Sequence, residues 1–130
     1  MARVLVIDRD DSVAEAVAAT LSGRDHRVKL ARDIAAAQKL LGREIFDLIV
    51  ADLPSIDVPG EGSFVEWLRV RQPSLAKRVI WIGTVVPFNG IVRANLEGAQ
   101  VLQKPFKADQ LLQAVETLLS EGVHAAPVEG

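Results

Sequence analysis

Two carboxylates and one amine stand out in this 130-residue chain because each follows a short apolar run. These are Asp8, Asp52 and Lys104. Carboxylates from two adjacent strands can share a hard divalent cation such as Mg²⁺, and a lysine beside them can neutralise a phosphoryl oxygen. An Asp nucleophile combined with Mg²⁺ and Lys can form an aspartyl phosphate. The pattern therefore indicates phosphoryl chemistry on a carboxylate.

Each of these residues also has an ordinary structural explanation. An Asp after a strand can begin a turn or cap a helix, and Lys104 can be a surface cation. Their shared position favours a site, because ligands in open α/β sheets bind beyond the carboxyl ends of the strands. We therefore treat the three residues as a candidate site.

The segments that must position these residues alternate between strand and helix patterns. Strands are expected at residues 4–7, 27–31, 46–52, 79–83 and 101–102, and helices start near residues 12, 33, 63, 87 and 107. Continuous apolar runs are typical of strands buried on both faces, and apolar residues three or four apart are typical of helices.

Helix boundaries are predicted from capping signals. Ser12 and Ser63 each begin a capping-box spacing, and Asp33 can cap a helix. Glycines are expected to end three helices, and these are Gly23, Gly42 and Gly122.

This strand–helix unit occurs five times, which predicts one α/β domain with a doubly wound parallel sheet. The expected strand order is 2-1-3-4-5, as in flavodoxin-like folds. We expect the domain to cover residues 1–122, with residues 123–130 forming a flexible tail or the start of a linker.

The composition narrows the classes of function. The net charge is −2 with a pI near 5.7, so the sequence predicts no nucleic-acid surface and no membrane-binding basic block. The chain has no cysteine and two histidines far apart, which argues against a thiolate or imidazole metal site. We expect a cytoplasmic protein without a signal peptide.

Several motifs occur in a fixed order along the chain. They are Val4-Leu5-Val6-Ile7-Asp8, Phe46-Asp47-Leu48-Ile49-Val50-Ala51-Asp52, Gly60, Gly98-Ala99, Lys104-Pro105-Phe106 and Leu111-Leu112. Together they resemble the receiver domains of two-component response regulators, from about Val4 to Leu119. The Lys-Pro-Phe group is the most specific of them.

The resemblance implies a role for each candidate residue. Asp52 corresponds to the phospho-acceptor, Asp8 to one of a pair of acids that hold Mg²⁺ together with Asp52, and Lys104 to the lysine that contacts the phosphoryl group. It also implies a cis peptide bond between Lys104 and Pro105.

Three positions depart from the pattern of that family. Arg9 stands where a second acid would contact the metal, so the sequence predicts weak Mg²⁺ binding. Gly83 occupies the position of the switch Ser/Thr, and Thr84 can serve only if the loop shifts by one residue. Val101 replaces the switch aromatic residue. We further predict that Arg9 lies within salt-bridge reach of Asp52 or Asp8, in place of the metal.

These features favour an atypical receiver domain in a phosphorelay, with weak or absent metal-dependent phosphorylation and a role as a protein-interaction module. It would not be an enzyme beyond autophosphorylation on Asp52. The expected partners are a histidine kinase or phosphotransfer protein and an output domain or protein. A homodimer would form through the helix at 87–96, the strand at 101–102 and the last helix.

Two alternatives stay open. The first is a fully active, Mg²⁺-dependent receiver that a histidine kinase phosphorylates. The second is a phosphatase of the haloacid dehalogenase type, because Asp8 with Asp10 two residues later resembles the first motif of that family.

Overall fold

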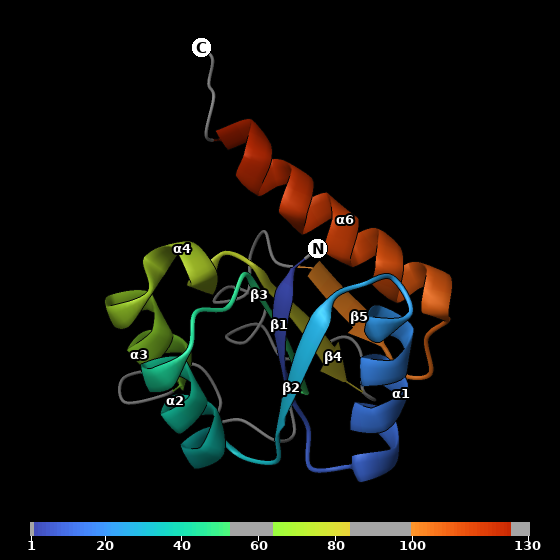
Figure 1. Cartoon of the computed structure of the whole chain (residues 1–130), viewed down its shortest axis with the longest axis horizontal. Helices are drawn as coiled ribbons and strands as arrows, with labels where there is room; N and C mark the ends of the chain where they lie inside the picture. Colours follow the sequence, from blue (N-terminus) through green and yellow to red (C-terminus); the bar gives the residue numbers. More distant parts are fainter. Residues whose placement is uncertain (1, 53–63, 84–99, 126–130) are drawn as a thin grey trace.

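The computed structural model describes residues 2–52, 64–83 and 100–125 and contains a five-stranded sheet flanked by helices (Figure 1). The elements in chain order are β1 (Arg3–Ile7), α1 (Asp11–Ser22), β2 (Arg27–Ala31), α2 (Ile34–Arg43), β3 (Leu48–Asp52), α3 (Phe64–Arg71), α4 (Pro73–Ala76), β4 (Val79–Gly83), β5 (Gln100–Gln103) and α6 (Ala108–Ala125).

The sheet is parallel and has the strand order β2-β1-β3-β4-β5, which confirms the predicted topology. Ile7 pairs with Ala51, Asp52 pairs with Ile82, and Gly83 pairs with Gln103. Because neighbouring strands end nearly level, the residues that follow β1 and β5 lie at the same edge as the end of β3.

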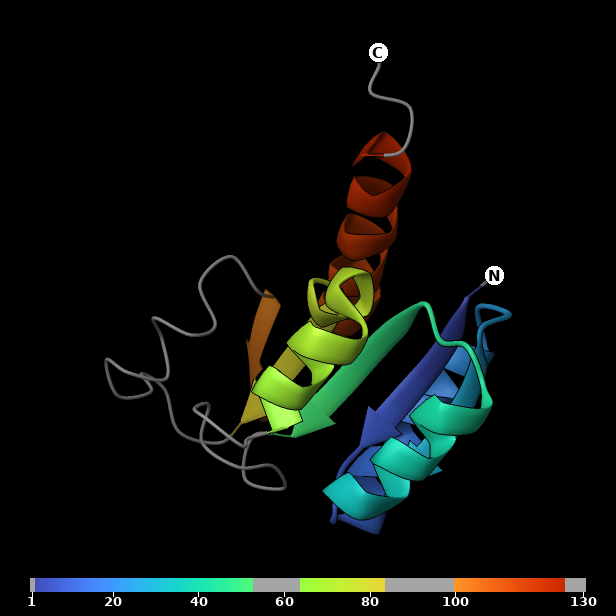
Figure 2. The same ribbon diagram turned by 90° about the vertical axis from the view of Figure 1, so that its left-hand side faces the viewer.

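Both faces of the sheet are covered by helices. In Figures 1 and 2, α1 and α6 lie on one face, while α2, α3 and α4 lie on the other. Alternate residues of β1 confirm this layering: Leu5 and Ile7 belong to the core under α2 and α3, whereas Val4 and Val6 belong to the core under α1 and α6. Side chains alternate between faces along a strand, so one apolar run supplies both cores.

Glycine was a poor guide to where the helices end. Gly23 does cap α1 as predicted. However, α2 continues past Gly42 to Arg43, and α6 continues past Gly122 to Ala125, so both of these predictions were wrong. A glycine inside a helix costs only about 1 kcal/mol relative to alanine, which neighbouring helical residues can offset.

Two other local predictions need correction or extension. Asp10, and not Ser12, caps α1, because the Asp10 carboxylate accepts bonds from the backbone N–H groups of Ser12 and Val13. The short helix α4 was not predicted, although it begins at Pro73, a residue that suits the first position of a helix. Asp33 caps α2 as expected.

Several predictions fall outside the described residues. They concern the loop at 53–62, the cap at Ser63, the residue Thr84, the helix at 87–96 and the end of the tail at 126–130. The domain boundary after residue 122 stays a prediction. In the part of the chain that the structure describes, no helix is both long enough and apolar enough to cross a membrane.

Leu118 and Leu119 of α6 allow a matched test of the core. Leu118 is 2 % exposed, whereas Leu119 is only partly buried against the same core. We expect Leu118→Ala to lower the free energy of unfolding by about 3 kcal/mol, and Leu119→Ala to cost clearly less. Urea denaturation of both variants measures the difference. Equal losses would contradict the predicted packing of α6.

Candidate functional site

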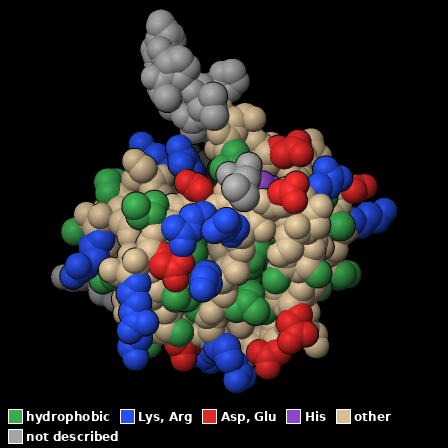
Figure 3. Space-filling model, in the orientation of Figure 1, with side chains coloured by type: hydrophobic (Ala, Val, Ile, Leu, Met, Phe, Trp, Pro, Cys, Tyr) green, Lys and Arg blue, Asp and Glu red, His purple; other side chains and the backbone are tan. Residues whose placement is uncertain are grey.

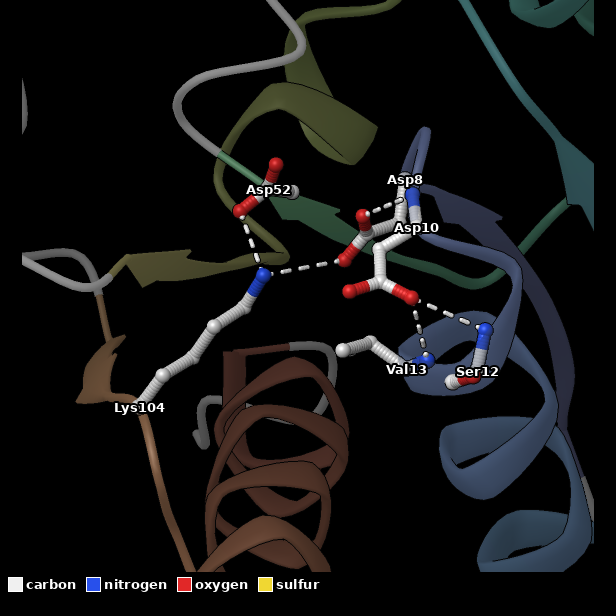
Figure 4. A network of polar contacts seen from close by, with 6 residues as sticks. All are labelled: Asp8, Asp10, Ser12, Val13, Asp52 and Lys104. Carbon is white, nitrogen blue, oxygen red and sulfur yellow. Dashed lines mark hydrogen bonds and ion pairs between the residues drawn. The ribbon is translucent and has the colours of Figure 1, made fainter.

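Asp8 lies in the turn directly after β1, and it is 1 % exposed. Its carboxylate oxygen Oδ1 accepts a hydrogen bond of 2.8 Å from the backbone N–H of Asp10 (Figure 4). Its own backbone N–H donates to the carbonyl of Ala31 at the end of β2. The carboxylate is therefore fixed by its own turn and points along the carboxyl edge of the sheet.

Asp52 is the last residue of β3, the central strand, and it is 4 % exposed. Its neighbours in the sheet are β1 on one side and β4 on the other. The rest of β3 is apolar, and the whole strand is buried, so the strand places one buried carboxylate at the carboxyl edge of the sheet.

Lys104 follows β5 and joins the two carboxylates. Its Nζ donates to Asp52 Oδ1 at 2.9 Å and to Asp8 Oδ2 at 3.3 Å (Figure 4). Its backbone N–H donates to the carbonyl of Gly83 at 2.7 Å, which ties the end of β5 to the end of β4. The Lys104–Pro105 bond is cis, as predicted. The structure thus brings together all three residues that the sequence singled out.

Burial and the charges of this cluster shift the pKa values of Asp8 and Lys104. Burial, together with the charge of Asp52, raises the pKa of Asp8 against the opposing effects of the Asp10 N–H and Lys104. Burial alone would lower the pKa of Lys104, but its bonds to Asp52 and Asp8 outweigh this and raise it. Lys104 therefore stays protonated at neutral pH and acts as a permanent counter-charge.

Asp10 does not join the cluster as a ligand. Its carboxylate instead accepts hydrogen bonds from the backbone N–H groups of Ser12, at 2.9 Å, and Val13, at 3.3 Å, at the start of α1 (Figure 4). A carboxylate at this position satisfies two N–H groups and favours the positive end of the helix dipole. The sequence signal for this role was an Asp just before the first helical turn.

The donor set fits a resident Mg²⁺ poorly. Both oxygens of Asp8 already accept bonds, and Lys104 lies between Asp8 and Asp52. Among the residues with a described placement, no group of three or more His, Cys, Asp or Glu side chains could hold a metal ion. The residue that follows Asp8 is the cation Arg9, which has no side-chain oxygen to offer a metal ion.

The remaining predicted positions have mixed outcomes. Arg9 is exposed, and its predicted approach to Asp52 or Asp8 stays a prediction. Gly83 is buried at the end of β4 and brings no hydroxyl group to the site. Thr84 lies outside the described residues, so its role is untested.

Comparison with known proteins agrees with this architecture. The transcriptional regulatory protein DltR of Streptococcus agalactiae is 29% identical over 117 residues, which cover 87% of this chain and 50% of DltR. The receiver domain of a response regulator from Clostridium thermocellum superposes with a TM-score of 0.78 at 20% identity, covering 95% of this chain and 98% of that one.

A third relative is known with a bound ion. The response regulator TrrA of Thermotoga maritima, solved in complex with Mg²⁺ and BeF, has a TM-score of 0.71 at 21% identity, covering 91% of this chain and 99% of that chain. No model of a protein family matches the chain.

The chain is thus similar in sequence to response regulators and has the fold of their receiver domains. It spans about half the length of the curated relative DltR. The phosphatase alternative gains no support from the geometry, because the second acid of its motif, Asp10, is occupied as a helix cap.

The ion pairs of Lys104 give a prediction about stability. Lys104→Met keeps much of the apolar stem but leaves two buried carboxylates without this cation, so we expect the free energy of unfolding to fall by about 3 kcal/mol. In an Asp8→Asn background the same change should cost about 1 kcal/mol less, because one carboxylate is already neutral. Chemical denaturation of the four proteins in this cycle measures both values.

The matched control is Lys107→Met, since Lys107 is an exposed lysine three residues further on. It should change stability by no more than about 0.5 kcal/mol. A loss for Lys104→Met as small as that of the control would show that the buried ion pairs do not stabilise the fold.

Proposed function

We propose that Asp52 is the phospho-acceptor of this receiver domain and that Lys104 offsets charge on the phosphoryl group. The supporting observation is the 2.9 Å contact between Lys104 Nζ and the buried Asp52 carboxylate. A fixed ammonium beside a nucleophilic carboxylate stabilises the negative charge on the oxygens of a transferring phosphoryl group. Asp8 supports the arrangement by holding the same ammonium from the other side.

We further propose that the domain is atypical, with weak or absent metal-dependent phosphorylation. Two residues support this: Arg9 introduces a cation beside Asp8, and Gly83 lacks a hydroxyl at the end of β4. TrrA, which shares the fold, is bound to Mg²⁺ and BeF in its structure. A fully active, Mg²⁺-dependent receiver phosphorylated by a histidine kinase is the alternative, and metal affinity separates the two.

The domain acts as a protein-interaction module in this proposal and has no enzymatic turnover beyond autophosphorylation. Its partners are a histidine kinase or phosphotransfer protein and an output domain or protein, in the cytoplasm. Homodimerisation would use β5, α6 and the chain at 87–96, of which the last lies outside the described residues. Val101 on β5 is 39 % exposed, which suits a contact surface.

Weak metal binding is directly testable. Trp81 is buried on β4 and pairs with Ala51, next to Asp52, so its fluorescence should report a metal at the site. We expect the wild type to show no saturable Mg²⁺ response at submillimolar concentration, because like charges about 4 Å apart repel by about 4 kcal/mol at an effective dielectric near 20. Arg9→Asp should bind Mg²⁺ at least about tenfold more tightly, equivalent to about 1.4 kcal/mol.

The control for this titration is Arg27→Asp, which changes net charge equally but at the start of β2, the opposite edge of the sheet. It should leave the Mg²⁺ response unchanged. Tight, saturable binding of Mg²⁺ by the wild type would instead favour the ordinary Mg²⁺-dependent receiver.

The acceptor role is tested by labelling with acetyl phosphate in the presence of Mg²⁺. We expect intact-protein mass spectrometry to show one added phosphoryl group on the wild type. Asp52→Asn removes the nucleophile and Lys104→Met removes the counter-charge, so neither variant should be labelled. Lys107→Met should be labelled like the wild type.

Because Lys104→Met is also expected to lose stability, labelling is read at a temperature where circular dichroism shows each variant folded. The double variant with Asp8→Asn, in which only one carboxylate is left without the cation, repeats the measurement. Labelling of Lys104→Met at the wild-type rate would contradict the proposed role of Lys104. Undiminished labelling of Asp52→Asn would show that Asp52 is not the phospho-acceptor.

A further inference from the structure

The phosphorylated pocket would lack positive charge. Asp8 contributes one negative charge, Lys104 contributes one positive charge, and a phosphoryl group on Asp52 carries about −1.5 to −2. The sum over these three groups is about −1.5 to −2, and both carboxylates are buried while the Lys104 side chain is 16% exposed. A second cation is needed to stabilise such a state.

A divalent metal is poorly placed to supply that charge. The ammonium of Lys104 already lies between Asp8 and Asp52, so a metal ion shared by these two carboxylates would face that positive charge at close range. The third nearby carboxylate, Asp10, is used by the start of α1. The cation must therefore come from another source.

The hydrogen bonds on either side of Arg9 fix its backbone next to Asp8. The bond of 2.8 Å from the Asp10 N–H to Asp8 Oδ1 closes a tight turn with Arg9 at its centre. On the other side of Arg9, Asp10 is anchored to α1. The backbone of Arg9 is thus fixed one residue from the buried pocket, while the residue itself is exposed and its long side chain can extend over the edge.

We propose that Arg9 takes the place of the divalent metal as the second cation, so that Asp52 is phosphorylated without a metal ion. This deepens the proposed function and rests on Asp52 being the acceptor. An Asp52 oxygen forms the bond to phosphorus, and the bond from phosphorus to the acetate oxygen of acetyl phosphate breaks. Acetate leaves with that electron pair. The Arg9 guanidinium donates paired N–H bonds to the phosphoryl oxygens, alongside Lys104.

The proposal is tested by the labelling rate in EDTA and in Mg²⁺, with acetyl phosphate and, separately, with phosphoramidate as donors. The wild type should be labelled on Asp52 at the same rate in both conditions. Arg9→Gln should be about 100-fold slower, as expected when one group that stabilises a developing oxyanion is removed. Arg9→Lys keeps the charge but loses the paired donors, so its rate should lie between these two.

Two variants sharpen the comparison. Arg9→Asp should be slow in EDTA and accelerated by Mg²⁺, because it exchanges the cation for a metal ligand. Arg27→Gln removes an exposed arginine at the far edge of the sheet and should be labelled like the wild type. Thermal melts check that every variant is folded, and an exposed position such as Arg9 is expected to tolerate substitution.

Three outcomes of the labelling experiment would contradict the proposed role of Arg9. Labelling of the wild type only in Mg²⁺ would overturn the role of Arg9 while leaving Asp52 as the acceptor. Labelling of Arg9→Gln in EDTA at the wild-type rate would also overturn it. If neither donor labels the wild type in either condition, this proposal and the acceptor role both fail.

Discussion

The candidate site depends on the ion pairs that the Lys104 ammonium forms with Asp8 and Asp52. Two carboxylates that are almost fully buried lie within 3.3 Å of this ammonium, and without a counter-charge their burial would be costly. The parallel register of the sheet makes the arrangement possible, since it brings the ends of β1 and β3 together and ties β5 to β4 through the Gly83 carbonyl. The fold thus places the two buried carboxylates where one ammonium group can neutralise part of their charge.

The fold could be predicted because several independent patterns in the sequence indicate the same topology. Apolar runs such as Leu48–Ala51 specify buried strands, and the alternation of strands with helices restricts the topology to a few choices. The three site residues could be found for the same reason, since each follows a strand. The topology brings these strand ends to one edge of the sheet, where Lys104 contacts both carboxylates.

Local details were less predictable because their signals are weak and compete. Gly42 and Gly122 cost too little to end a helix that its neighbours favour. Asp10 and Ser12 both offer an oxygen to the start of α1, and only the geometry of the turn decides in favour of Asp10. The direction of a long, exposed side chain such as Arg9 follows from no periodic pattern, so its role needs an experiment.

The contact between Lys104 and Asp8 joins residues that are 96 positions apart in the chain. Contacts of such long sequence separation close large loops, and the conformational entropy lost in that closure opposes their formation. No short segment of the chain contains all three charged residues. They are brought together only when β1, β3, β4 and β5 have paired in the sheet. In a partly folded chain, including one still being synthesised, the three charged groups would lie apart.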